Sequence, residues 1–239
     1  MMMVQPPALM DHWDDFNRPN ATDLGPNYRA EYDACRVFNN KSQITNPAQF
    51  SSRQGAWETW IAGHNGGRLL TDNWEVIALI AAPTGSLALD NASAIGVGMF
   101  DNGPAAGMVL VYGMFLQGAV TSANAMAIYT YINPSIPAPG LLWGSGTPTA
   151  SRAAVTNRVS PGDIMRFRRR MYSPTQSVFQ LTQNGVLRCS WNDSTGIVPA
   201  GQRNRRRWFL AQEGNAAGLS SGQYYSPAID SIRAYDRPY

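Results

Sequence analysis

Short runs of apolar and β-branched residues recur along the whole chain, and each run is bounded by Gly, Pro, Asn or Asp. None of them keeps a helical period between capping residues, so the pattern predicts strands rather than helices. We expect an all-β protein with strands at 36–38, 48–51, 56–61, 74–81, 93–100, 107–116, 124–132, 152–157, 163–171, 177–182, 186–191, 206–212 and 228–235.

The strands between residues 74 and 132 carry apolar side chains at successive positions, so both of their faces must be covered. One face can meet an opposing sheet, whereas the other needs a long loop or a neighbouring subunit. The segment 133–149 contains four prolines and three glycines. Such a long connection either covers a face of the sheet or carries function.

Two tyrosines on these central strands are candidates for an oligomer interface. Tyr129 and Tyr131 alternate with Met126 and Ile128, so they lie together on the other apolar face of the predicted strand 124–132. An apolar face of this kind is suited to burial between subunits.

Three arginines form a second candidate interface. In the predicted strand 163–171, Arg166, Arg168 and Arg170 alternate with Met165 and Phe167, so the guanidinium groups line one outer face. We expect them to be solvated or paired with a neighbouring subunit, and contact with phosphate or acidic glycan is the alternative.

The sequence Asn184-Gly185 predicts a hairpin between two strands. A two-residue turn would pair Leu181 with an arginine and mix apolar with charged residues on one face. A three-residue loop at 183–185, with its glycine as a left-handed bulge, avoids this mixing. We expect the three-residue loop, because it groups four residues on the core face: Phe179, Leu181, Leu187 and Cys189.

The 239-residue chain is long for one domain, but β-sandwiches reach this length as single units. No repeat or linker divides it, so we expect an N-terminal arm at 1–10 and one sandwich domain at 11–239. No stretch approaches the roughly 20 apolar residues of a membrane helix, and the start lacks the features of a secretory signal. We therefore expect no membrane insertion and synthesis in the cytoplasm without a signal peptide.

Residues for catalysis are scarce. His12 and His64 are the only histidines, neither has metal-ligand spacing, and no GxSxG elbow is present. Cys35 and Cys189 are too few for a disulfide framework, so we expect buried free thiols. The net charge of +3 is below that of a dedicated nucleic-acid binder. We expect no catalytic residue, metal, cofactor or nucleic-acid partner.

A glycosidase with paired carboxylates is the remaining enzymatic alternative. Glu31-Tyr32-Asp33 imitates the start of the Glu-x-Asp-x-x-Glu motif of a jelly-roll glycosidase family, but Arg36 occupies the position of the third acid. We therefore expect a protein that is not an enzyme.

Aromatic residues beside stretches rich in Gly, Asn and Ser are suited to stacking on sugar rings. The candidate carbohydrate-binding residues are Trp60 with His64 and Asn65, and Tyr224 with Tyr225. The alternative is that each ring fills the core or an interface.

Several short motifs together resemble one family. The opening Asp14-Asp15-Phe16-Asn17-Arg18-Pro19-Asn20, followed by Leu24-Gly25-Pro26-Asn27-Tyr28, resembles the start of concanavalin-like jelly-roll domains in minor tail proteins of bacteriophages that infect actinobacteria. The order and spacing of the matches extend over nearly the whole chain, although Tyr28 stands where the family has Trp. The further matches are Gly96-Val97-Gly98, Pro161-Gly162-Asp163, Asn184-Gly185, Asp193-Ser194-Thr195-Gly196 and 229–236.

The resemblance implies a two-sheet antiparallel jelly-roll sandwich in which the last strand returns beside the first. It also implies a structural minor tail protein of the virion that contacts other tail proteins, with adsorption to cell-envelope glycan as a further role. Tail fibres are usually homotrimers, so a homo-oligomer is expected. The alternatives are a free carbohydrate-binding module and, less favoured, a glycoside hydrolase.

Overall fold

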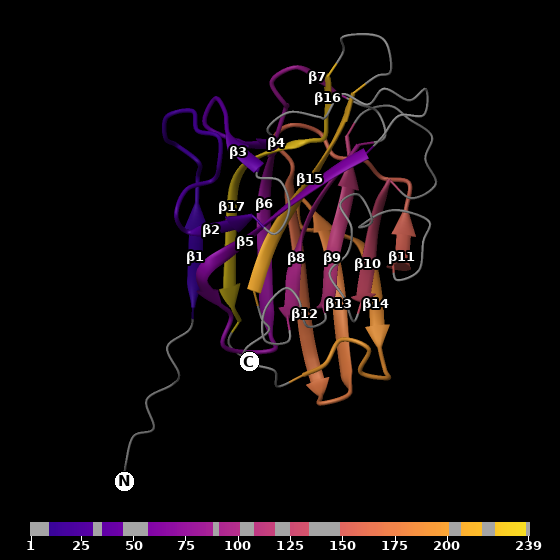
Figure 1. The fold of residues 1–239 in the computed structure, drawn as a ribbon. Coiled ribbons are helices and arrows are strands. Elements are labelled where there is room, and N and C mark those ends of the chain that lie inside the picture. The colour runs from indigo at the N-terminus through magenta and orange to yellow at the C-terminus, as the bar shows by residue number, and fades with distance from the viewer. Residues whose placement is uncertain are drawn as a thin grey trace.

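The computed structural model describes residues 10–30, 35–44, 57–87, 91–100, 108–117, 125–133, 149–200, 207–216 and 223–237. These residues form two stacked β-sheets and no helix (Figure 1). Accordingly, this part of the chain has no helix that could cross a membrane. The prediction of an all-β, two-sheet sandwich is confirmed.

One sheet has eight strands, which come from both ends and the middle of the chain. Its order is β14-β13-β12-β6-β17-β4-β3 with β1 beside β17, where the strands are β1 (Asp11–Asp14), β3 (Cys35–Val37), β4 (Ser42–Ile44), β6 (Trp74–Ala81), β12 (Ile164–Ser173), β13 (Gln176–Gln183), β14 (Val186–Asp193) and β17 (Ala228–Asp236). The last strand pairs antiparallel with the first, with Trp13 opposite Arg233. The predicted return of the chain end is therefore present.

The other sheet has nine strands. Its order is β11-β10-β9-β8-β15-β16-β7 with β5 between β15 and β2, where the strands are β2 (Tyr28–Ala30), β5 (Trp57–Arg68), β7 (Ser86–Leu87), β8 (Ala92–Phe100), β9 (Met108–Leu116), β10 (Met126–Asn133), β11 (Thr149–Val155), β15 (Arg207–Ala216) and β16 (Gln223–Tyr225). Among the described strand pairs, only β16 with β7 is parallel.

The core lies between the two sheets and is built from alternate positions of each strand. Trp74 of β6 is fully buried, and its ring centroid lies 5.5 Å from that of Phe167 in β12 and 6.1 Å from that of Phe179 in β13. Ile95 and Val97 of β8 enter the same core from the nine-stranded sheet. The period of two in the sequence thus corresponds to the packed face of each strand.

The turn between β13 and β14 has two residues and not the predicted three. Gln183 pairs with Val186, and the intervening Asn184 and Gly185 have φ values of 51° and 80°. Positive φ at both central positions is typical of a type I′ turn, whose twist matches that of the strands it joins.

The expected bulge exists, but it lies in β14 rather than in the loop. The register skips Arg188 between the pairs Thr182–Leu187 and Leu181–Cys189. Leu181 and Cys189 therefore face the core as predicted, whereas Leu187 is 50% exposed and does not. Both cysteines of the chain are free and buried, as expected.

Gly96 allows β8 and β9 to approach closely. A Cβ at Gly96 would clash with the Val111 oxygen and lie 2.6 Å from Tyr112 Cβ, whereas a Cβ at Gly113 would meet only the end of the Leu181 side chain. We expect Gly96→Ala to lower the free energy of unfolding by about 3 kcal/mol, because backbone atoms must shift. Gly113→Ala should cost clearly less, since Leu181 can change rotamer. Urea denaturation of both variants makes the comparison, and equal losses would contradict it.

Candidate functional site

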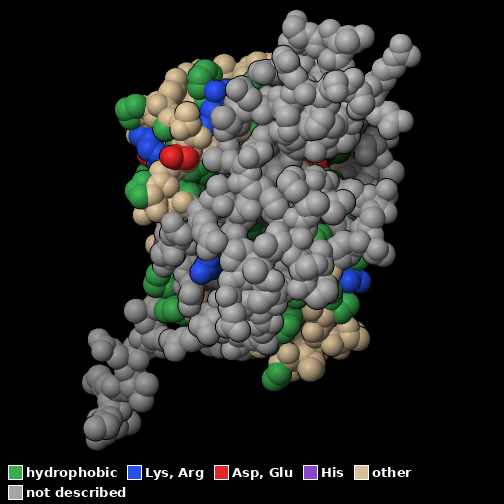
Figure 2. All heavy atoms as spheres, viewed as in Figure 1, with side chains coloured by type: hydrophobic (Ala, Val, Ile, Leu, Met, Phe, Trp, Pro, Cys, Tyr) green, Lys and Arg blue, Asp and Glu red, His purple; other side chains and the backbone are tan. Residues whose placement is uncertain are grey.

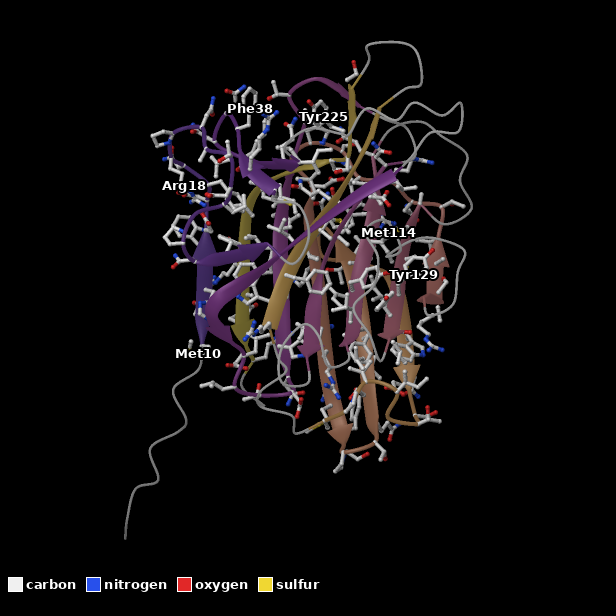
Figure 3. All side chains as sticks on the ribbon, viewed as in Figure 1. Met10, Arg18, Phe38, Met114, Tyr129 and Tyr225 are labelled. Carbon is white, nitrogen blue, oxygen red and sulfur yellow. The ribbon has the colours of Figure 1, made fainter. Side chains whose placement is uncertain are left out.

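A second apolar cluster covers the outer face of the nine-stranded sheet. Its fully described members are 5% exposed or less, and Tyr129 packs against them. Figure 3 shows Met114 of β9 and Tyr129 of β10 among these side chains. The buried members are Ala92, Ala94, Leu110, Tyr112, Met114, Leu116, Ala125, Ala127, Tyr131, Phe209 and Ala211.

This burial corrects one of the interface predictions. Tyr131 is fully buried within the single chain, so the expectation that it lies on a face left open for another subunit is wrong. Tyr129 is half-buried, and its ring stacks on that of Tyr112 at a centroid distance of 5.7 Å and an interplanar angle of 16°. Both faces of these central strands are therefore covered inside one chain.

Glu213 is an acidic residue on this outer face. It follows Phe209 and Ala211 at alternate positions of β15, is 3% exposed, and its Oε2 accepts a hydrogen bond of 2.8 Å from the Ala92 N–H. Burial raises the pKa of the Glu213 carboxyl well above its ordinary value. The described outer positions of β8, β9, β10 and β15 hold no second carboxyl, whereas glycoside hydrolysis uses two.

The raised pKa gives Glu213 a defined effect on stability. Above the ordinary carboxyl pKa of 4.5, the folded state retains a proton that the unfolded state has lost, so this contribution to stability falls as pH rises toward the folded-state pKa. Glu213→Gln stays neutral and keeps an acceptor for Ala92. We expect its stability relative to the wild type to increase as the pH rises above about 5 in urea titrations. A difference that does not change with pH would contradict this.

The structure corrects the expectation for Tyr225. Its side chain is 6% exposed, and a Cβ at Gly85 would lie 2.6 Å from Cε2 of the Tyr225 ring. The ring therefore packs against the backbone of a neighbouring segment and is not the surface platform that the sequence suggested. Figure 3 shows it near β16 at the top of the sandwich.

The other predicted sugar-binding residues lie on strands. Trp60, His64 and Asn65 all belong to β5, which continues well beyond its predicted end, and Tyr224 belongs to β16. Trp60 is in register with Gln212, whose amide is buried. The side chains of these four candidates lie outside the described residues, so their role remains a prediction.

The outer face of the eight-stranded sheet carries the predicted arginines. Arg166 pairs through Nε with Oε1 of Glu75 at 3.0 Å, and Arg237 of the chain end pairs with Oε2 of the same carboxylate at 3.0 Å. Arg168 Nε donates a 2.8 Å hydrogen bond to Gln180 Oε1. Arg170 is exposed. The alternation of β12 is thus as predicted, with three guanidinium groups on one outer face.

The same outer face carries an exposed aromatic residue that sequence analysis did not single out. Trp13 of β1 is 65% exposed and borders a shallow hollow of about 680 Å³ that Ile77, Leu79 and Ile164 also line. Beside it, Arg233 forms an ion pair with Asp11 at 2.6 Å. The short strand β1 is too polar to be found from apolar periodicity.

The first motif of the chain forms a network of hydrogen bonds at the edge of the sandwich. The Asp14 carboxylate accepts two bonds from the Arg18 guanidinium at 2.7 and 2.9 Å and one from the Phe16 N–H at 2.8 Å. Arg18 also donates to the Leu24 oxygen at 2.7 Å. Figure 3 marks Arg18 at this edge, and Figure 2 shows charged side chains of both signs gathered at the upper left, beside β3.

Three further acids from the matched motifs also accept hydrogen bonds that connect segments of the chain. Asp163 accepts hydrogen bonds from the side chains of Gln183 and Asn184. Asp193 accepts backbone N–H groups of the loop that follows it, and Asp236 binds two other segments of the chain. Among the described residues, no three His, Cys, Asp or Glu side chains come together as metal ligands would.

Comparisons with known proteins agree on the architecture. No family model matches the chain, and no curated protein matches its sequence. Its fold is similar to that of an endo-1,3-β-glucanase from Streptomyces sioyaensis, with a TM-score of 0.54, 10% identity and 100% of both chains covered. It is also similar to the metal-free carbohydrate recognition domain of Emp46p, with a TM-score of 0.53, 10% identity, and coverage of 95% of this chain and 100% of that one.

A third similar structure is the exoplasmic/lumenal domain of VIP36 with bound Ca²⁺ and Man2, with a TM-score of 0.52, 10% identity, and coverage of 96% of this chain and 88% of that one. At these identities the likeness defines the fold. The chain has the concanavalin A-like jelly-roll fold.

Proposed function

We propose that this chain is a structural protein of a bacteriophage tail, and that its jelly-roll domain contacts glycan of the host cell envelope. One observation carries the proposal: the motifs that resemble minor tail proteins form the turns and hydrogen bonds that connect segments of this sandwich. Asp14 with Arg18, the turn at Asn184 and Gly185, and the carboxylate of Asp236 are examples. The matched motifs thus occupy positions that hold the sandwich together, and their order along the chain supports the tail setting.

The use of the acidic residues favours binding over cleavage. Glu75, Asp163, Asp193 and Asp236 hold arginines, amides or backbone N–H groups, so their lone pairs are already engaged. Glu213 lies beside an apolar cluster, and no other described carboxyl shares its position on the sheet. A hydrolase needs two carboxyls that face one sugar bond, and the described residues offer no such pair.

In this proposal the protein resides on the virion, as a homo-oligomer and most simply a trimer, in contact with other tail proteins. Immunogold electron microscopy of particles from a lysate of a host that carries the gene tests this directly. Gold should label one end of the tail, and antibody preincubated with purified chain should not label. Labelling of the head only, or of no particle although the chain is present in the lysate, would contradict the proposal.

A glycoside hydrolase is the second candidate, and the buried Glu213 favours it. A carboxyl that keeps its proton in an apolar surrounding has the state of a general acid. The hydrolase requires that purified chain releases reducing ends from a polysaccharide and that Glu213→Gln abolishes the release. We expect no release from either protein.

A further inference from the structure

The outer face of the eight-stranded sheet contains a basic groove that no described acid fills. Its volume is about 580 Å³, and residues of β12 and β13 line it together with Asn73, just before β6, and Arg237, just after β17. We call it the arginine groove and define it by Asn73, Arg168, Arg170, Tyr172, Gln180 and Arg237.

The charge of the arginine groove is unbalanced. Glu75 is the nearest acid in the register, opposite Arg168, but its two oxygens are taken by Arg166 and Arg237. Among the described side chains, no carboxylate pairs with Arg168 or Arg170. Among the described side chains on this part of the sheet, one carboxylate therefore faces four guanidinium groups, and the surplus charge is positive.

The guanidinium groups are held in place by neutral neighbours. Gln180 accepts the Nε–H of Arg168 at 2.8 Å, and no described residue accepts its terminal N–H groups, which can therefore bind a ligand. Arg170 lies over the Tyr172 ring, with its central carbon 5.0 Å from the ring centroid. Neutral acceptors and an aromatic face orient an arginine without cancelling its charge, which preserves its affinity for an anion.

An exposed aromatic ring completes the groove. Tyr172 is 56% exposed, so its ring is open to a ligand at the end of β12. A ring that offers a stacking face beside guanidinium forks is suited to a sugar that carries an anionic group: the apolar face of the sugar packs on the ring, and the anion accepts the N–H groups.

We infer that the arginine groove binds a polysaccharide whose sugars carry carboxylate or phosphate groups. The choice of a polysaccharide rests on the proposed function, whereas the choice of an anionic one rests on the groove itself. Arg168 and Arg170 contact the anion, and Tyr172 packs on the sugar ring. This assigns the exposed arginines to a ligand and not to a neighbouring subunit.

Isothermal titration calorimetry with three polymers tests the inference. Polygalacturonate supplies carboxylates, poly(glycerol phosphate) supplies phosphates, and dextran is the neutral control. We expect the full chain to bind at least one anionic polymer and to show no binding to dextran. Its affinity for the anionic polymer should fall as the salt concentration is raised. The preferred polymer identifies the anionic group.

Two double variants with the same net charge provide the matched comparison. Arg168→Gln/Arg170→Gln removes two guanidinium groups from the groove, and Arg152→Gln/Arg188→Gln removes two from β11 and β14. We expect the groove variant to bind at least about tenfold more weakly and the control to bind within about twofold of the wild type. If the groove variant unfolds, Arg170→Glu at an exposed position replaces it, with the same loss expected.

Four results would overturn the inference: equal losses in both double variants, binding of dextran as tight as that of the anionic polymers, tighter binding of duplex DNA than of either polymer, and a change of oligomeric mass in the groove variant. The last would make this face a contact between copies of the chain. If envelope glycan still binds the groove variant at full affinity, the proposed function stands and the groove is not its site.

Discussion

Replacing Arg169 with methionine should lower the free energy of unfolding by about 3–5 kcal/mol. Arg169 is 1% exposed on the core side of β12, where its guanidinium pairs with Asp72 at 3.3 Å. It also donates to the backbone oxygens of Val198 at 3.0 Å and Pro199 at 3.2 Å and to Ser177 Oγ at 3.0 Å. Methionine keeps most of the aliphatic volume but removes these bonds from a dry site.

The adjacent residue provides the control for this variant. Arg170→Met makes the same chemical change at an exposed position of the same strand, and we expect it to alter stability by less than about 0.5 kcal/mol. Urea denaturation at neutral pH measures both variants. Similar losses in the two variants would contradict the burial of Arg169 and the exposure of Arg170.

The second large effect is expected at Asp236, near the end of β17. Its carboxylate accepts the N–H groups of Met10 at 3.1 Å, Leu70 at 2.9 Å and Thr71 at 2.8 Å, together with the Thr71 hydroxyl at 2.9 Å. Asp236→Asn turns an amide donor toward these donors. We expect a loss of about 3 kcal/mol in the free energy of unfolding, because buried N–H groups lose their acceptor.

Asp230 is the matched control for Asp236. It lies half-buried in the same strand, and its carboxylate makes no hydrogen bond with the described residues. Asp230→Asn should leave the thermal midpoint almost unchanged, whereas Asp236→Asn should lower it by several degrees. Equal midpoints for the two variants would contradict the conclusion that the hydrogen bonds of Asp236 hold three segments of the chain together.

Strands with strong apolar alternation were predictable from the sequence. The predicted segment 74–81 coincides with β6, and the period of two placed Arg166, Arg168 and Arg170 on one outer face. Apolar residues at successive positions between 74 and 132 indicated two covered faces. Both faces are buried in β8, β9 and β10, whereas the outer Ile77 and Leu79 of β6 are only partly buried. The predicted strand at 48–51 lies outside the described residues.

Strands that bury polar residues were not predictable in this way. In β4, Ser42 and Gln43 are almost fully buried because each finds a distant partner: Ser42 bonds the Gln212 amide, and Gln43 exchanges two bonds with the backbone of Thr84. A search for apolar runs in the sequence therefore does not detect a strand of this kind. β5 was predicted to end early, because glycine and polar residues fill its second half.

The candidate site was visible only in part. Alternation identified Arg168 and Arg170, but Arg237 and Tyr172 join them through register and strand ends that the sequence does not reveal. The burial of Arg169 depends on Asp72, which is 97 residues away in the chain. Long-range partners of this kind decide which arginine is structural and which is open to a ligand.

The central claim is that this domain binds envelope glycan and does not cleave it. The direct measurement incubates purified chain with an insoluble cell-envelope polysaccharide fraction and follows, in the same tube, the chain that sediments and the reducing ends that appear in solution. We expect the chain to sediment with the polysaccharide while reducing ends stay at the level of the blank. Release of reducing ends that disappears in Glu213→Gln would contradict the account, and so would a chain that stays wholly in solution.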